Sequence, residues 1–142
     1  MSLSGTILAA IITLQPNVQM QYAQELADAI AIESLTADES VIAVAVAMQE
    51  SSLLRLTHGP ESYGTYQLHE VTIKNYGIVI RDLSTIRGEV QAYFLIMRDK
   101  QRICDHLIES WTCFHSFTPI HRDAYSIAVN RWLALLNTRL GE

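Results

Sequence analysis

The sequence has few of the residues on which sheet proteins and nucleic-acid-binding proteins depend. Only 6 of its 142 residues are Gly and 3 are Pro, too few for a fold with many tight turns. Charged residues make up 18%, below the roughly 25% of an average soluble protein, and the net charge is -5. With a mean hydropathy of +0.15, these values disfavour disorder and a polybasic nucleic-acid binder. They predict a single, mainly helical domain over residues 1–142.

Long hydrophobic runs are also lacking. The apolar run near the N-terminus extends only from Ile7 to Leu14, whereas a membrane-spanning helix needs about 20 residues. No Lys or Arg precedes this run, so it does not have the positive segment of a secretory signal. We therefore expect mature sequence without a membrane span. The two cysteines, Cys104 and Cys113, are too few for a disulfide framework, and whether they pair stays open.

Helical spacing and capping signals predict about six helices around a central buried one. Asn17 is a candidate N-cap for a helix that ends near Ser34. Thr36 and Glu39 form a capping box that predicts the start of the next helix. The run from Val41 to Met48 in that helix is apolar on every side, which predicts a central, buried position. Its Val/Ala alternation would also suit a buried strand.

The rest of the chain is predicted to be helical apart from one irregular region. Over residues 51–77 the periodicity fails, and turn-forming residues predict a loop with a short helix or a small hairpin. Helical spacing returns over residues 85–113, where we predict two helices with a break near Asp99. A last helix is predicted from about Arg122 to a C-terminal cap at Gly141.

One carboxyl group is predicted where its charge is disfavoured. Glu50 follows the most apolar segment, at the C-terminal turn of the predicted central helix. Burial and the negative end of the helix dipole both disfavour the carboxylate, so the pKa of Glu50 should be raised. Such a group can act as a general acid near neutral pH. The alternative is an ordinary Glu that faces solvent or pairs with nearby Arg55.

An aromatic and amide-rich stretch follows Glu50 in the sequence. Tyr63, Tyr66 and Gln67 are suited to binding a sugar polymer. Aromatic faces pack against sugar rings, and amides form hydrogen bonds with hydroxyl and acetamido groups. A turn with half-buried Tyr side chains is the alternative interpretation of the same residues.

Three sequence blocks occur in a characteristic order. Glu50-Ser51 is followed by Gly64-Thr65-Tyr66-Gln67 and then by residues 111–116, with Tyr125 on the last predicted helix. They resemble the Glu-Ser, Gly-Leu-Met-Gln and Ala-Tyr-Asn blocks, and the later Tyr, of the soluble lytic transglycosylases and goose-type lysozymes, which cleave peptidoglycan. The resemblance covers residues from about 40 to 132.

The resemblance implies a lysozyme-like fold and a lytic transglycosylase that cleaves the MurNAc-GlcNAc β-1,4 bond. Glu50 would be its acid and then its base, and the muramic 6-hydroxyl would attack its own anomeric carbon to give a 1,6-anhydromuramoyl product. Thr65-Tyr66 replaces Leu-Met and Phe114-His115 replaces Tyr-Asn, so contacts with the sugar should differ from those of the family. The predicted substrate-binding residues are Ser51, Tyr63, Tyr66, Gln67, His115 and Tyr125.

Two other functions stay open at this point. A hydrolytic lysozyme would need a second acid to hold water, for which Glu61 and Glu70 are candidates. A non-catalytic glycan-binding protein of the same fold would pack Glu50 away from any cleft.

No cofactor or metal is predicted, because the possible ligands do not have a common zinc spacing. These ligands are Cys104, His106, Cys113, His115 and His121. We expect a monomer whose partner is a peptidoglycan glycan strand. Without a signal of its own, such an enzyme would reach the cell wall in the periplasm as a phage-released lysin or as a virion component.

Overall fold

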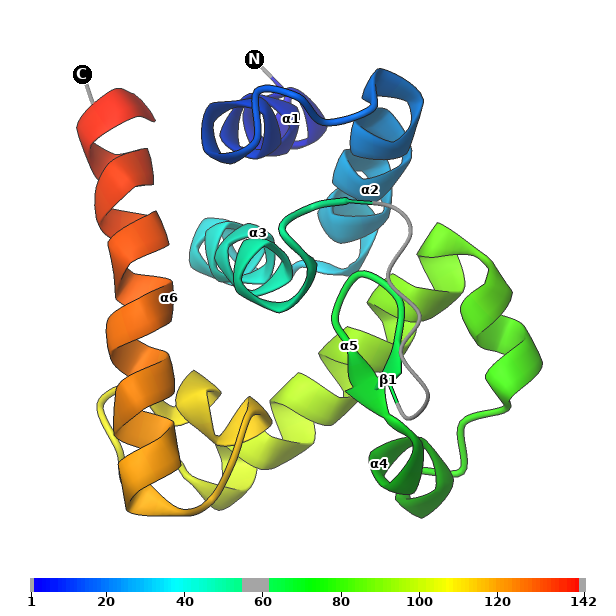
Figure 1. Cartoon of the computed structure of the whole chain (residues 1–142), viewed down its shortest axis with the longest axis vertical. Coiled ribbons are helices and arrows are strands. Elements are labelled where there is room, and N and C mark those ends of the chain that lie inside the picture. Colours follow the sequence, from blue (N-terminus) through cyan, green and yellow to red (C-terminus); the bar gives the residue numbers. More distant parts are fainter. Residues whose placement is uncertain (1, 55–61, 141–142) are drawn as a thin grey trace.

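Helices make up most of the chain, as the composition predicts (Figure 1). The computed structural model describes residues 2–54 and 62–140. These residues form six α-helices, two short 3-10 helices (η) and a two-stranded sheet. In chain order the elements are α1 (Leu3–Leu14), α2 (Met20–Glu33), α3 (Ala37–Ser51), β1 (Ser62–Tyr63), β2 (Leu68–His69), α4 (Glu70–Asn75), η1 (Ile80–Ser84), α5 (Ile86–Ile103), η2 (Ser110–Phe114) and α6 (Pro119–Leu140).

Helix α3 lies at the centre, where it contacts α1, α2 and α6 (Figure 1). Its five residues from Ala43 to Ala47 have no exposed surface. At its start the Thr36 hydroxyl accepts a hydrogen bond from the Glu39 N–H (3.1 Å), and the Glu39 carboxylate accepts one from the Leu35 N–H (2.6 Å). The central helix and its cap are thus confirmed, and the strand alternative for this run is wrong.

Helix α2 begins later than the sequence indicated. Gln19 is its N-cap, so the prediction of Asn17 as N-cap is wrong. The Asn17 N–H instead donates to the side-chain oxygen of Gln15 (3.3 Å) in the turn after α1. The apolar face predicted for this segment is nevertheless buried; it consists of Val18, Tyr22, Leu26 and Ile30.

Helix α5 runs without interruption through Asp99, so the predicted break at this position is wrong. The Asp99 carboxylate accepts hydrogen bonds from the Tyr76 hydroxyl (2.6 Å) and from Arg102 (2.8 Å). No Gly or Pro follows Gly88 within the helix, and Arg98 and Lys100 on either side of Asp99 have hydrogen-bond partners outside it, the Glu39 carboxylate and the Phe114 carbonyl. The helix ends at Ile103, after which the chain forms turns and η2 rather than a second α-helix.

Helix α6 starts at Pro119, three positions before the predicted start at Arg122. Pro is tolerated in the first turn because its missing N–H has no intrahelical partner there. The predicted cap at Gly141 lies outside the described residues. Figure 1 shows α6 along one side of the molecule, where it contacts α1 and α3.

The irregular region contains both structures that the sequence left open. Strands β1 and β2 form an antiparallel hairpin in which Ser62 pairs with His69 and Tyr63 with Leu68. Helix α4 follows at once, and Gly77 ends the region with a φ of 66°. Among the described residues, no helix combines the length and the apolar character that crossing a membrane requires.

Candidate active site

The end of α3 places Glu50 at the edge of the central core. Ser52 and Leu53 follow the helix in the left-handed conformation, with φ values of 58° and 57°. The Ser52 N–H donates to the Met48 carbonyl (2.9 Å), which caps the helix, and the Leu53 side chain is buried. Non-glycine residues in this conformation are strained and gather at functional sites. Gln67, at φ 49°, is the remaining such residue in the described part of the chain.

A cavity of about 500 Å³ opens beside Glu50. Residues from α3, the hairpin, α4, α5 and the η2 region contribute to its wall. The side chain of Glu50 is 17% exposed, so its carboxyl group is largely buried yet borders open space. The lining residues are Glu50, Ser62, Gln67, Leu68, His69, Thr72, Ile96, Lys100, Phe114 and His115.

The environment of Glu50 favours the protonated carboxyl group. Burial raises its pKa from 4.5 to about 7, as the sequence predicted, and the nearby Tyr125 hydroxyl partly opposes this rise. The two side chains are close but do not reach hydrogen-bond geometry, and the buried Tyr125 hydroxyl has no hydrogen-bond partner among the described residues. A carboxyl group with this pKa can both donate and accept a proton near neutral pH.

His115 lies next to Glu50, although it is distant in sequence. Its Nδ1 is 4.0 Å from Glu50 Oε1, and its ring stacks on Tyr125 with centroids 4.3 Å apart. Burial lowers the pKa of His115, and the positive charges of His121 and Lys100 lower it further. Near pH 7 both shifts favour neutral forms, so Glu50 and His115 do not form a simple ion pair.

The hairpin turn brings Gln67 to the same cavity. Its side-chain amide donates to the Gly64 carbonyl (2.8 Å), which fixes the end of the turn. Thr65 anchors the turn to the core, because its hydroxyl lies 2.6 Å from that of Tyr22 and donates to Glu89 (3.2 Å). The cavity thus unites Glu50, Gln67 and His115 from the three sequence blocks.

Four other predicted site residues do not line this cavity. The Ser51 hydroxyl is buried and donates back to the Ala47 carbonyl (3.1 Å). Tyr66 is only 1% exposed and stacks on Tyr93 with centroids 3.9 Å apart, so its ring packs in the core and does not face the cavity. Tyr125 is likewise buried, behind His115, and Tyr63 is half-buried in β1.

Of the two acids considered for holding water, Glu70 is not among the residues that line the cavity. Glu70 lies on α4 and pairs with Lys74 (3.4 Å), an exposed i,i+4 contact. Glu61 lies outside the described residues. Glu50 is therefore the only carboxylate among the described residues that line the cavity.

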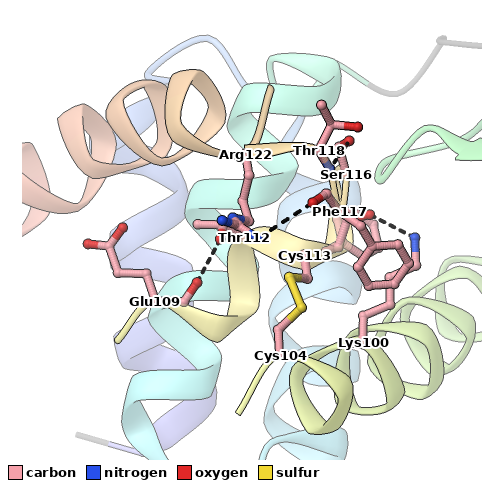
Figure 2. Close-up of a disulfide and its surroundings, with 10 residues drawn as sticks. Lys100, Cys104, Glu109, Thr112, Cys113, Ser116, Phe117, Thr118 and Arg122 are labelled. Carbon is pink, nitrogen blue, oxygen red and sulfur yellow. Dashed lines mark hydrogen bonds between the residues drawn. A yellow bond between two sulfur atoms is a disulfide. The ribbon is translucent and has the colours of Figure 1, made fainter. Parts of the chain in front are cut away.

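Lys100 is a cavity residue that the sequence did not indicate. It lies one helical turn after Ile96 on α5, so both side chains reach the same wall. Its ammonium group donates to the Phe114 carbonyl (3.0 Å) and lies 5.7 Å from the ring centroid of Phe117 (Figure 2). The spacing of four residues between the buried Ile96 and Lys100 is the sequence signal that could have placed Lys100 at this wall.

A disulfide holds η2 against the end of α5. Figure 2 shows the bond between Cys104, which follows α5, and Cys113 in η2. Both cysteines are buried, and the next two residues after Cys113 are the cavity residues Phe114 and His115. The pairing that the sequence left open is thus present, and it fixes the segment that faces Glu50.

Within residues 2–54 and 62–140, no group of three or more His, Cys, Asp or Glu side chains is arranged to hold a metal ion. Comparisons of the chain with protein-family models, with curated proteins and with solved structures find no match.

Proposed function

We propose that this protein is a lytic transglycosylase that cleaves peptidoglycan, with Glu50 as its general acid and base. The observation that carries the proposal is the position of Glu50: a largely buried carboxyl group, with its pKa raised to about 7, that borders a cavity large enough for sugar units. A glycan-binding protein without activity would have no need for a carboxyl group tuned in this way. The resemblance of the three sequence blocks to lytic transglycosylases points to the substrate.

The reaction uses Glu50 twice. Its protonated carboxyl group donates a proton to the glycosidic oxygen as the bond from the muramic anomeric carbon to that oxygen breaks. The resulting carboxylate then takes the proton of the muramic 6-hydroxyl, whose oxygen forms a new bond to the same anomeric carbon. The products are a new GlcNAc hydroxyl end and a 1,6-anhydromuramoyl end, and Glu50 is protonated again. No water is consumed.

Two neighbours support this role for Glu50. His115 has a lowered pKa and lies 4.0 Å away, so it does not hold Glu50 in its ionised form by a full positive charge near pH 7. Gln67 lines the same cavity and carries an amide, the type of group that binds an acetamido group.

A hydrolytic lysozyme is the second candidate function. Glu50 is the only carboxylate among the described lining residues, and Glu70 is engaged with Lys74. An intramolecular nucleophile does not require a second acid to position water. This favours the lyase, and substitution of Glu61 tests whether that residue supplies the base of a hydrolase.

The place of action proposed is the cell wall in the periplasm, reached by phage release or as part of a virion. The disulfide between Cys104 and Cys113 supports a site of action in an oxidising compartment.

The proposal is tested by the rate at which purified cell walls are solubilised. Glu50→Gln keeps the shape of the side chain but has no carboxylic proton, so we expect a loss of at least ~10²-fold. Glu25→Gln, on the exposed face of α2, is the matched control and should retain the parental rate. Equal rates for the Glu50→Gln and parental proteins would refute the role of Glu50.

A further inference from the structure

Lys100 is a cation inside the cavity that lacks a carboxylate partner among the described residues. Within residues 2–54 and 62–140 its one hydrogen bond goes to the Phe114 carbonyl (3.0 Å). The adjacent Asp99 is engaged elsewhere, by Tyr76 and Arg102. The charge of Lys100 is therefore not neutralised by an ion pair within the described part of the protein.

The surroundings of Lys100 hold its ammonium group in a fixed place. The nitrogen lies 5.8 Å from the ring centroid of Phe114 and 5.7 Å from that of Phe117. Aromatic rings attract a cation but do not neutralise it. An ammonium group has three N–H donors, and the Phe114 carbonyl takes one. The other two donors have no partner among the described residues and can serve a group that enters the cavity, and burial of a cation favours an anionic partner.

We infer that Lys100 binds a carboxylate carried by the muramic acid units of the strand and so makes the cavity selective for peptidoglycan over uncharged β-1,4-linked glycans. The inference rests on the proposed function and names a determinant of its specificity. Muramic acid differs from glucosamine by a lactyl ether, whose carboxyl group is free on a strand without peptides and amide-linked where a stem peptide is attached. The carboxylate can thus come from the lactyl group itself or from the peptide.

The charge balance of the cavity fits such a ligand. Glu50, the only carboxyl group among the described lining residues, is mostly protonated below its pKa of about 7 and then does not repel an incoming carboxylate. His69 and His115 are the other titratable lining residues, and neither carries negative charge. An anionic group therefore meets net positive charge in the cavity at mildly acidic pH.

The test measures binding by calorimetry at pH 6 in the Glu50→Gln protein, which removes turnover. Two ligands are compared: a tetrasaccharide of alternating GlcNAc and MurNAc with free lactyl carboxylates, and the same tetrasaccharide with these groups converted to carboxamides. We expect the acid to bind about tenfold more tightly than the amide, as for a hydrogen bond to a charged group. Adding Lys100→Met should reduce the ratio to below about twofold.

Lys74→Met is the matched control, because Lys74 is the only other lysine of the chain and lies on α4 outside the cavity lining. It should leave the tenfold ratio unchanged. Lys100→Arg, which retains the charge, should keep part of the preference. The comparison of acid with amide in the Glu50→Gln protein needs no Lys100 variant to fold, so it tests the inference even if Lys100→Met unfolds.

The outcomes separate this inference from the proposed function. If acid and amide bind equally and Lys100→Met does not selectively weaken a ligand with stem peptides either, Lys100 has a purely structural role and the inference is overturned while glycan binding stands. Equal weakening of all these ligands by Lys100→Met would overturn it as well. Failure of the protein to bind any of the glycans would overturn both. A third ligand with stem peptides identifies the source of the carboxylate: a preference that appears only with peptides assigns the peptide carboxylates, and one that appears without them assigns the lactyl group.

Discussion

The raised pKa of Glu50 has a consequence for stability that is independent of any substrate. In the folded protein the pKa is about 7, against 4.5 for an ordinary Glu. The folded state therefore binds more protons than the unfolded state between these pH values, and stability falls as pH rises through this window. The loss of stability caused by ionising the buried Glu50 is complete above pH 7 and absent below about pH 4.5.

The size of the effect follows from the two pKa values. The difference between 4.5 and about 7 corresponds to about 3 kcal/mol of lost stability once Glu50 is ionised in the fold. Because the side chain is only 17% exposed, solvent screening reduces this value little. Glu50→Gln cannot ionise, so it should be more stable than the parental protein by about 3 kcal/mol at pH 8 and of similar stability at pH 4.

Urea unfolding followed by circular dichroism at pH 4, 6 and 8 measures this difference directly. Glu25→Gln, on the exposed face of α2, controls for the loss of one negative charge and should show no such trend. Other titrating groups, such as His115, are present in all three proteins and largely cancel in the comparison. If the free energies of unfolding of Glu50→Gln and of the parental protein changed in parallel from pH 4 to pH 8, the conclusion that burial raises the pKa of Glu50 would be wrong.

Two further predictions concern the segments that face Glu50. Gly64→Ala should cost about 1–3 kcal/mol, because Gly64 has a φ of 73° and an added Cβ would collide with the Glu89 carboxylate; an unchanged thermal midpoint would contradict the tight approach seen there. Replacing Cys104 and Cys113 by Ser together should cost about 2–3 kcal/mol in urea unfolding, as expected for closure of a loop with a sequence separation of 9. The parental protein under full reduction should then match the double variant, and equal midpoints with and without reductant would argue against the disulfide's contribution.

The central helix and its carboxyl group could be predicted from sequence because the signals are local. The Thr36 cap and an apolar run without a polar face define α3, and burial at its end sets the pKa of Glu50. Asn17 shows the limit of such local signals, because this residue type is favourable as an N-cap but Asn17 lies in the turn after α1 instead.

The remainder of the site depends on contacts between distant segments. Tyr66 has the right chemistry for sugar stacking, but Tyr93 on α5 takes its ring face, a pairing that no local pattern indicates. The sequence predicted a helix break near Asp99, next to Lys100. The position of Lys100 in the cavity wall depends on η2, which the disulfide holds against the end of α5. A shared cleft for Gln67, His115 and Glu50 was expected only through the resemblance of the sequence blocks, because no local pattern joins these distant segments; in the structure all three line one cavity.

The most direct test of the proposed chemistry is mass spectrometry of peptidoglycan digested by the parental protein and by Glu50→Gln. We expect 1,6-anhydromuramoyl ends from the parental protein, lighter than reducing muramic ends by one water, and at least ~10²-fold less of them from the variant. Reducing muramic ends alone would contradict the lyase reaction. Intact peptidoglycan after treatment with folded parental protein, or equal product from Glu50→Gln, would contradict the assignment of Glu50 as the catalytic acid.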